Sequence, residues 1–157
     1  MQLTSSFYKH PIIKYDENKS LYGNDKIKIT ISRNVLEMLK LYRQIEVHQH
    51  EKGGILIGKF KENNIDIIDL THPFPLDRSS RYAFHREDPM HDKILQAKWS
   101  LSGKQLGLLG DWHTHPEVSP TASGIDLKGW SQQLQREHPY VFLIQGTQSL
   151  SVYCTHT

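Results

Sequence analysis

The stretch Asp111–Asp126, which reads DWHTHPEVSPTASGID, decides how the rest of the chain is interpreted. It contains His113 and His115 two positions apart, with Pro116 directly after them. Side chains two apart on an extended strand lie on the same face, and both imidazoles can therefore point to one place. Pro116 supports this geometry because the residue before a proline is displaced towards the β region. The spacing thus favours a strand that carries two candidate metal ligands.

A third candidate ligand, Asp126, follows at the end of the same stretch. Two imidazoles and one carboxylate supply three zinc ligands and leave the fourth tetrahedral position for water, as in a catalytic zinc site. The pattern therefore predicts a hydrolase that binds Zn²⁺ through His113, His115 and Asp126.

Two other interpretations of these residues stay open. A His-x-His pair alone is weak evidence, because the chain has 10 histidines and contains a second such pair, His48 and His50. We expect those two at the surface or behind the metal ligands. Ser123 followed three residues later by Asp126 is also typical of a helix N-terminus, where a serine caps the helix and an acid is stabilised by the macrodipole. A capping role for Ser123 does not exclude a role in catalysis.

The complete string, H-x-H-P-x6-S-x-x-D with an upstream glutamate, resembles the motif of the JAMM (MPN, JAB) zinc metalloproteases. Its positions are filled here by Glu51, His113, Thr114, His115, Pro116, Ser123 and Asp126. The resemblance implies a cytidine-deaminase-like α/β fold and zinc bound by the two histidines and Asp126. It also implies that Glu51 moves the proton from water to the leaving amine, and that Ser123 donates a hydrogen bond to the oxyanion. The residues alone do not prefer Glu51 over Glu46 or Glu117; of these, Glu117 is the main rival, which we expect to be exposed in a loop.

The similarity extends to one prokaryotic branch of that family. Phe84 and Arg86, then Asp88 and a helix with Trp99, then GDWHTHPE follow in the order typical of short JAB proteases. Those proteases are encoded beside E1/E2-like enzymes in CBASS antiphage-defence operons and integrative elements. The resemblance covers roughly residues 25–155. It implies an isopeptidase that releases a cGAS-like nucleotidyltransferase, or a ubiquitin-like protein, from conjugates made through an extended C-terminal tail, with an E1/E2-like enzyme as a further partner.

Three alternatives remain at this point. The chain could mature a ubiquitin-like sulfur carrier, or it could be a non-catalytic MPN-type scaffold that only binds partners. Intact ligands and an intact Glu51 argue against the scaffold. Metal chemistry on a nucleobase is the third alternative, but the H-x-E…P-C-x-x-C pattern of the zinc deaminases is absent.

Composition sets broad limits on the chain. Its 157 residues, 37% hydrophobic and 23% charged, predict one globular domain over residues 1–157. A net charge of +2 is too small to argue for a nucleic-acid partner. We see no apolar run long enough to span a membrane and no secretory signal, and we expect a cytoplasmic protein. The single cysteine, Cys154, excludes an intrachain disulfide and suits a small apolar position in the last strand.

Hydrophobic periodicity predicts an α/β fold, with a mixed β-sheet flanked by helices. The expected strands are 26–32, 55–57, 65–71 and 106–112, with a C-terminal hairpin of 140–144 and 149–153. The expected helices are one of about 14 residues from Arg33, one from 88–89 to Gly103, and one from Ser123 to about Glu137. A turn at 61–64 joins two of the strands. Residues 1–24 should wrap the surface or pair at a sheet edge.

Three smaller expectations concern the surroundings of the site. Asp111 could fix the tautomer of a ligand imidazole. The segment 73–86 reads as an irregular connection, and its arginine-rich part, 77–86, is either a solvated loop or a wall that grips an extended peptide. His91 should be exposed or lie at the edge of the core.

Overall fold

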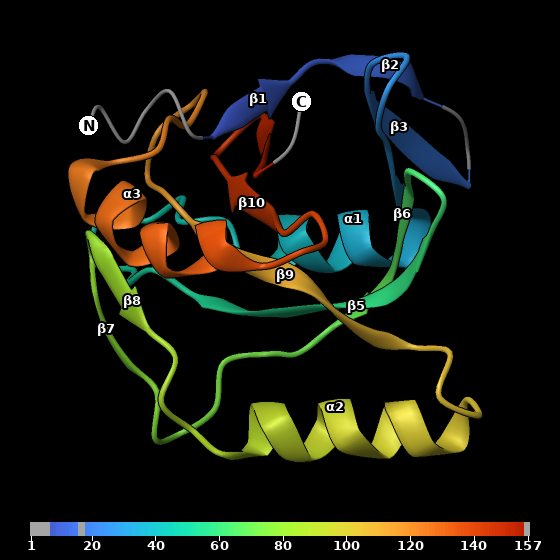
Figure 1. Cartoon of the computed structure of the whole chain (residues 1–157). Coiled ribbons are helices and arrows are strands. Elements are labelled where there is room, and N and C mark those ends of the chain that lie inside the picture. Colours follow the sequence, from blue (N-terminus) through green and yellow to red (C-terminus); the bar gives the residue numbers. More distant parts are fainter. Residues whose placement is uncertain (1–6, 16–17, 156–157) are drawn as a thin grey trace.

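A mixed β-sheet runs through the centre of the molecule in the computed structural model, which describes residues 7–15 and 18–155 (Figure 1). Within these residues the strands follow the order β1-β11-β10-β9-β5-β6-β4-β3-β2. Two neighbouring pairs, β9 with β10 and β4 with β6, are parallel, and the other pairs are antiparallel. The strands are β1 (Tyr8–His10), β2 (Ile12–Tyr15), β3 (Lys19–Gly23), β4 (Lys28–Ser32), β5 (Gly53–Lys61), β6 (Asn64–Leu70), β9 (Gly107–Thr114), β10 (Val141–Gln145) and β11 (Leu150–Cys154).

Helices cover the central strands on both sides, which confirms the predicted mixed α/β class. In Figure 1, α1 (Arg33–Leu41) lies above the central strands and α2 (Met90–Leu101) lies below them. The helix α3 (Gly124–Trp130) continues into the 3₁₀ helix η2 (Ser131–Gln135). A separate hairpin of β7 (Arg78–Ser80) and β8 (Ala83–His85) stands beside the sheet.

Two hydrophobic clusters fill the space between sheet and helices. Strand β10 contributes to both, because alternate side chains point to opposite faces. Val141 and Leu143 belong to the cluster shared with α1, whereas Phe142 and Ile144 pack with Trp130 at the end of α3. Every residue of β10 is buried, as expected for a strand covered on both faces. The strands that carry the candidate ligands are thus held in the middle of the core.

The helix that begins at Arg33 is shorter than predicted, with 9 residues instead of about 14. Ile45, three residues after Tyr42 in the sequence and within the predicted length of the helix, is 64% exposed. The chain leaves the helix because the buried side chain of Gln44 is held elsewhere. Its amide donates to the carbonyls of Gln49 and Arg81, at 3.2 and 3.0 Å, and accepts a hydrogen bond from the Thr114 hydroxyl.

The position of His91 also differs from the prediction. Its side chain lies in the core rather than at the edge of the core, and it is 1% exposed. Its Nδ1 lies 2.6 Å from the hydroxyl of Thr71, and its Nε2 lies 2.7 Å from a carboxylate oxygen of Asp77. The imidazole therefore ties α2 to the end of β6 and to the loop that precedes β7. Among the apolar residues of α2, Trp99 and Leu101 are exposed.

Two further segments differ in part from the prediction. The segment 73–86 is not irregular throughout, because it contains the β7–β8 hairpin. The helix from Ser123 becomes 3₁₀ after Trp130, and Ile125, expected on its buried face, is 65% exposed.

The turns and edges follow the prediction more closely. Glu62 and Asn63, in the expected hairpin turn, both adopt positive φ angles, as a tight turn between β5 and β6 requires. Strand β1 pairs with β11 at one edge of the sheet, while β2 and β3 form the other edge. Residues 1–6 and 16–17 of the N-terminal segment lie outside the described residues. Cys154 is buried in β11, as expected.

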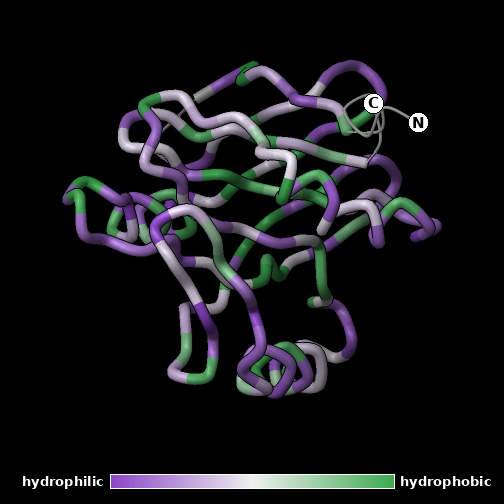
Figure 2. Tube along the Cα trace, turned by 90° about the vertical axis from the view of Figure 1, so that its left-hand side faces the viewer, coloured by the Kyte–Doolittle hydropathy of each residue, from purple (hydrophilic) through white to green (hydrophobic). Residues whose placement is uncertain are grey.

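Figure 2 shows apolar segments, in green, within the central strands, and both green and purple segments in the outlying connections. Helix α2, at the bottom of both views, mixes the two colours along its length. Among the described helices, none combines the length and the hydropathy needed to cross a bilayer.

Candidate metal centre

Strand β9 presents the two histidines of the HTHP motif to one point. It lies between β5 and β10, and the backbone of Gly110 approaches β10 so closely that a Cβ there would lie 1.8 Å from the carbonyl oxygen of Val141. The hydrogen-bonding pattern continues past the strand end, since the N–H of His115 donates to the Gln145 carbonyl at 3.0 Å. The Nε2 atoms of His113 and His115 lie 3.0 Å apart, and both residues are buried. The two-residue spacing therefore does bring the imidazoles together.

Asp126 is aimed at these imidazoles by the cap of α3. The Ser123 hydroxyl accepts a hydrogen bond from the N–H of Asp126 at 3.0 Å, and a carboxylate oxygen of Asp126 accepts from the N–H of Ser123 at 2.9 Å. The same carboxylate has its Oδ1 3.2 Å from the Nε2 of His113 and its Oδ2 3.0 Å from the Nε2 of His115. The expected capping box is present, and it positions the acid for the cluster.

The spacing of these donors suits a small tetrahedral ion. Bonds of about 2.0–2.1 Å at tetrahedral angles would separate ligand atoms by about 3.3 Å. The two Nε2 atoms lie 3.0 Å apart, and each has a different Asp126 oxygen beside it, Oδ1 at 3.2 Å from His113 and Oδ2 at 3.0 Å from His115. Imidazole nitrogen and carboxylate oxygen are also the donors that zinc accepts. The residues therefore fit zinc in both chemistry and distance.

Glu51 offers a second way to complete a ligand set, because one of its oxygens lies within 4.8 Å of the ligand atoms of both histidines. Its distance from the Nε2 of His115 is 3.6 Å, longer than either distance from Asp126. Its backbone N–H donates to the Ser80 carbonyl at 2.7 Å, which fixes the entry of the chain into β5. Glu51 therefore lies beside the tighter group of three.

The glycines after Glu51 are needed for this arrangement. A Cβ at Gly53 would lie 2.6 Å from the Phe84 ring and 2.6 Å from the Trp112 carbonyl, and one at Gly54 would lie 2.2 Å from the Thr71 carbonyl. The glycine pair thus lets β9 and the β7–β8 hairpin approach the strand that carries the glutamate.

Burial and charge shift the pKa values of the two acids in opposite directions. Burial raises the pKa of Glu51 to about 8; the charge of His115 opposes this change, and those of Asp126 and Glu117 add to it. Burial also acts to raise the pKa of Asp126, but hydrogen bonds from His113 and His115 outweigh it and hold that pKa far below its ordinary value. Burial acts to lower the pKa of His115, but the bond to Asp126 raises it overall. The site therefore has one acid that stays charged and one that readily accepts a proton.

Glu117 is exposed in the loop after β9, as expected, but its contact with His115 was not predicted. Its carboxylate lies 2.8 Å from the Nδ1 of His115, on the opposite side of the ring from Asp126, and its side chain is 48% exposed. Asp111, which we expected to fix an imidazole tautomer, instead pairs with Arg86. Strand alternation could not have predicted the Glu117 contact, because β9 ends at Thr114 and Glu117 lies in the bend that follows.

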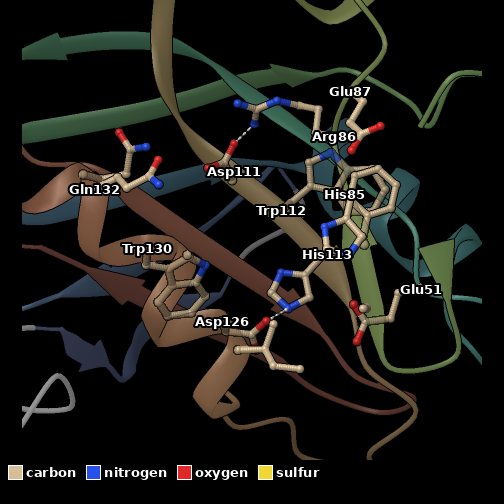
Figure 3. Close-up of a pocket in the computed structure, with 16 residues that line it drawn as sticks. Glu51, His85, Arg86, Glu87, Asp111, Trp112, His113, Asp126, Trp130 and Gln132 are labelled. Atoms are coloured by element: carbon tan, nitrogen blue, oxygen red, sulfur yellow. Dashed lines mark hydrogen bonds and ion pairs between the residues drawn. The ribbon is translucent and has the colours of Figure 1, made fainter. Parts of the chain in front are cut away.

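A cleft of about 420 Å³ opens beside the cluster. Figure 3 shows Glu51 and His113 at one end and the Arg86–Asp111 pair at the other. The walls come from β8 and from α3 with η2; the lining residues include Phe84, His85, Arg86, Trp130, Gln132 and Gln133. The other two arginines of segment 77–86 are not among the lining residues. Arg78 bonds to Glu87, which does line the cleft, and Arg81 bonds to the carbonyls of Glu46 and Val47.

Comparison with known proteins identifies the family of the chain. The family model for prokaryotic homologs of the JAB domain matches residues 36–155, and the chain belongs to that family. A protein of Pseudomonas aeruginosa (strain BWHPSA011 / Pa011) named CD-NTase/cGAS isopeptidase is 31% identical over 140 residues, which cover 87% of this chain and 84% of that protein. A protein of the same name from Escherichia coli (strain TW11681) is 30% identical over 122 residues, 78% of each chain. Another, from Vibrio cholerae, is 28% identical over 118 residues, 75% of this chain and 76% of that one.

One solved structure supports the fold alone. A protein from Desulfitobacterium hafniense superimposes with a TM-score of 0.51 at 23% identity, over 74% of this chain and 73% of its own. The resemblance to prokaryotic JAB isopeptidases, first seen in the HTHP motif, is therefore confirmed by family membership and by relatives that match most of the chain.

Proposed function

We propose that this chain is a zinc-dependent isopeptidase that cleaves the bond after the C-terminus of a CD-NTase, a cGAS-like nucleotidyltransferase, and so reverses its conjugation. The observation that carries the proposal is the cluster of His113, His115 and Asp126 with Glu51 beside it. The isopeptidase names of the relatives support the substrate class. Conjugation by an E1/E2-like enzyme, with a role in antiphage defence, is part of the same proposal.

His113, His115 and Asp126 would hold the zinc ion. When bound there, zinc would supply Lewis-acid chemistry, activating a water molecule and polarising the scissile carbonyl. The cap of α3 and the register of β9 keep the three side chains in place without substrate, and little reorganisation is needed.

Glu51 would take the proton from the attacking water and deliver it to the leaving lysine amine. Its carboxylate is buried, lies beside the ligand group and is held by the backbone at the mouth of β5. A general base must lie within hydrogen-bond reach of the proton that it removes, and the 3.6 Å between the Glu51 carboxylate and the Nε2 of His115 supports this role for Glu51.

Ser123 would donate a hydrogen bond to the developing oxyanion. Its hydroxyl oxygen accepts from Asp126, but a serine hydroxyl still has its own proton to donate. The cleft between β8 and η2 would hold the extended tail of the substrate, with Phe84 and Trp130 on its walls.

The experiment is a cleavage assay on two substrates. One carries a reporter protein fused through a peptide bond to the C-terminus of the CD-NTase encoded nearest to this chain. The other carries the same reporter linked through a lysine isopeptide bond. Mass spectrometry then locates any cut made by the wild type, by Glu51→Gln and by enzyme treated with a chelator.

Cleavage of the isopeptide substrate at the natural C-terminus, by the metal-loaded wild type alone, is the expected result. Cleavage of a ubiquitin-like sulfur carrier instead of the CD-NTase would contradict the proposed substrate. A protein that neither binds zinc nor cleaves either substrate would contradict the enzymatic proposal and leave a scaffold in its place.

A further inference from the structure

Glu117 faces the nitrogen of His115 that points away from the proposed metal. The Nδ1 of His115 lies 2.8 Å from the Glu117 carboxylate, whereas the Nε2 belongs to the ligand group. A neutral imidazole carries one proton, and its other nitrogen must provide the lone pair that binds a metal. A carboxylate acceptor at Nδ1 keeps the proton on that side of the ring.

The opposite side of the ring pulls the proton the other way. The Nε2 of His115 has the Asp126 carboxylate at 3.0 Å and the Glu51 carboxylate at 3.6 Å. Both oxygens would accept a proton placed on Nε2, and a proton there blocks the lone pair that zinc requires. The imidazole of His115 therefore lies between carboxylates that compete for its proton. Of these carboxylates, Glu117 favours the tautomer that can bind a metal.

The loop that carries Glu117 is fixed to the β10–β11 turn. The Glu117 carbonyl accepts from the N–H of Thr147 at 2.8 Å, and the Val118 carbonyl accepts from the N–H of Ser149 at 3.1 Å. A Cβ at Gly146 would lie 2.5 Å from the Glu117 carbonyl oxygen, which means that only glycine allows this approach. A partly exposed glutamate thus has a defined backbone position, as an orienting role requires.

We propose that Glu117 is a positioning residue that holds His115 in the tautomer competent to bind zinc, and that it is not the general base. The inference rests on the proposed metal site but concerns a residue outside the motif that defines it. Glu117 contacts the ring of a ligand rather than the reacting atoms, which separates its role from that of Glu51.

The test combines metal affinity with a spectroscopic readout. Zinc dissociation constants are measured by competition with a chromogenic chelator for the wild type, Glu117→Ala, Glu117→Gln and Glu137→Ala. Glu137 is an exposed glutamate outside the site and serves as the matched control. Loss of an acceptor behind a metal-ligating histidine typically weakens metal binding by about 10- to 100-fold, and we expect that loss for Glu117→Ala. Glu117→Gln, which keeps an acceptor oxygen, should lie closer to the wild type, and Glu137→Ala should match it.

The tautomer is read in metal-free protein by long-range ¹H–¹⁵N spectra of ¹⁵N-histidine, at a pH where the imidazoles are neutral. Glu117→Ala should move the proton of His115 towards Nε2 and leave His113 unchanged. Equal zinc affinity of Glu117→Ala and the wild type, or an unchanged His115 spectrum, would overturn the inference. This readout needs neither zinc nor substrate and tests Glu117 even if the proposed peptidase activity fails.

Discussion

At the scale of single residues, the groups proposed to hold a metal are separate from the group proposed to move protons. The distances place Asp126 closer to the histidines than Glu51, although both acids are near enough to be considered. Because of this difference in distance, we expect substitutions of Asp126 and Glu51 to have different effects on zinc binding.

Glu51→Gln should bind zinc as the wild type does and lose cleavage by about 10²- to 10⁴-fold, because proton transfer is lost while the ligands remain. Asp126→Ala should lose both zinc and cleavage. Zinc content by mass spectrometry and cleavage rates are measured on the same preparations, with Glu137→Gln as the control. Loss of zinc from Glu51→Gln would show that Glu51 is a ligand.

Ser123 has two roles that substitution can separate. Ser123→Ala removes both the cap and the hydroxyl, and should cost about 1 kcal/mol of unfolding free energy. Ser123→Gly removes the hydroxyl but keeps most of the capping, since glycine costs only a few tenths of a kcal/mol at this position. Loss of the oxyanion donor should slow both variants by about 10²- to 10³-fold. Thermal melts and rates check this, and a Ser123→Gly enzyme of wild-type rate would exclude the oxyanion role.

The structure brings together the motif residues that the sequence predicted to converge, because their geometry is local. Alternation on a strand and the first turn of a capped helix fix where His113, His115 and Asp126 point relative to their own elements. The partners of the motif are not local. Asp111 pairs with Arg86, which is 25 residues away in sequence, and no rule of local spacing predicts that pair.

At the scale of elements, the approach of β9 to β10 sets the ligand geometry. Gly110→Ala should prevent it, because the new Cβ would lie 1.8 Å from the Val141 carbonyl oxygen and neither backbone can move without breaking the ladder. Gly107→Ala, in the same strand, meets nothing within 4 Å and serves as the control.

We expect Gly110→Ala to destabilise the fold by more than about 2 kcal/mol and to abolish zinc binding, while Gly107→Ala keeps both. Urea unfolding and zinc titration measure the two effects. A Gly110→Ala protein with wild-type stability would mean that the two strands lie further apart than described.

Asp77 links the loop before β7 to α2 and gives the fold a dependence on pH. Burial acts to raise its pKa, but backbone hydrogen bonds at Asp88, Phe74 and Glu87, with the bond to His91, hold it below the ordinary value. An acid whose pKa is lower in the folded state stabilises that state above its ordinary pKa. The contribution is lost as the pH falls through the folded pKa.

Asp77→Asn should therefore cost at least about 2 kcal/mol at neutral pH, and the difference from the wild type should shrink in acid. Urea unfolding of both proteins across the acid range measures it, with Asp66→Asn, an exposed aspartate on β6, as the control. A cost that stays constant down to the lowest pH would contradict the role of the charge.

The elements that periodicity missed share one physical cause. Helix α1 ends early because Gln44 bonds to three other segments, and His91 is buried because Asp77 and Thr71 satisfy both ring nitrogens. Tertiary hydrogen bonds of this kind override local preference, and one sequence alone does not reveal them. Strand β10 was predicted well because a strand that is buried on both faces has a continuous run of apolar residues in the sequence.

At the scale of the whole molecule, the fold brings together ends of elements that are far apart in the chain. Glu51 enters from β5, the histidines from the end of β9, and Asp126 from the cap of α3. The two hydrophobic clusters hold these elements on both faces of one sheet. The cleft is lined by residues from the ends of these elements.

The most direct test of this account is the position of zinc in a crystal, located by anomalous scattering on either side of the zinc absorption edge. The account predicts one peak bonded to the Nε2 atoms of His113 and His115 and to Asp126 at about 2.0–2.2 Å, with Glu51 outside the bonded ligands. A zinc ion bonded to Glu51 in place of Asp126, or no peak at a zinc concentration that supports cleavage, would contradict it.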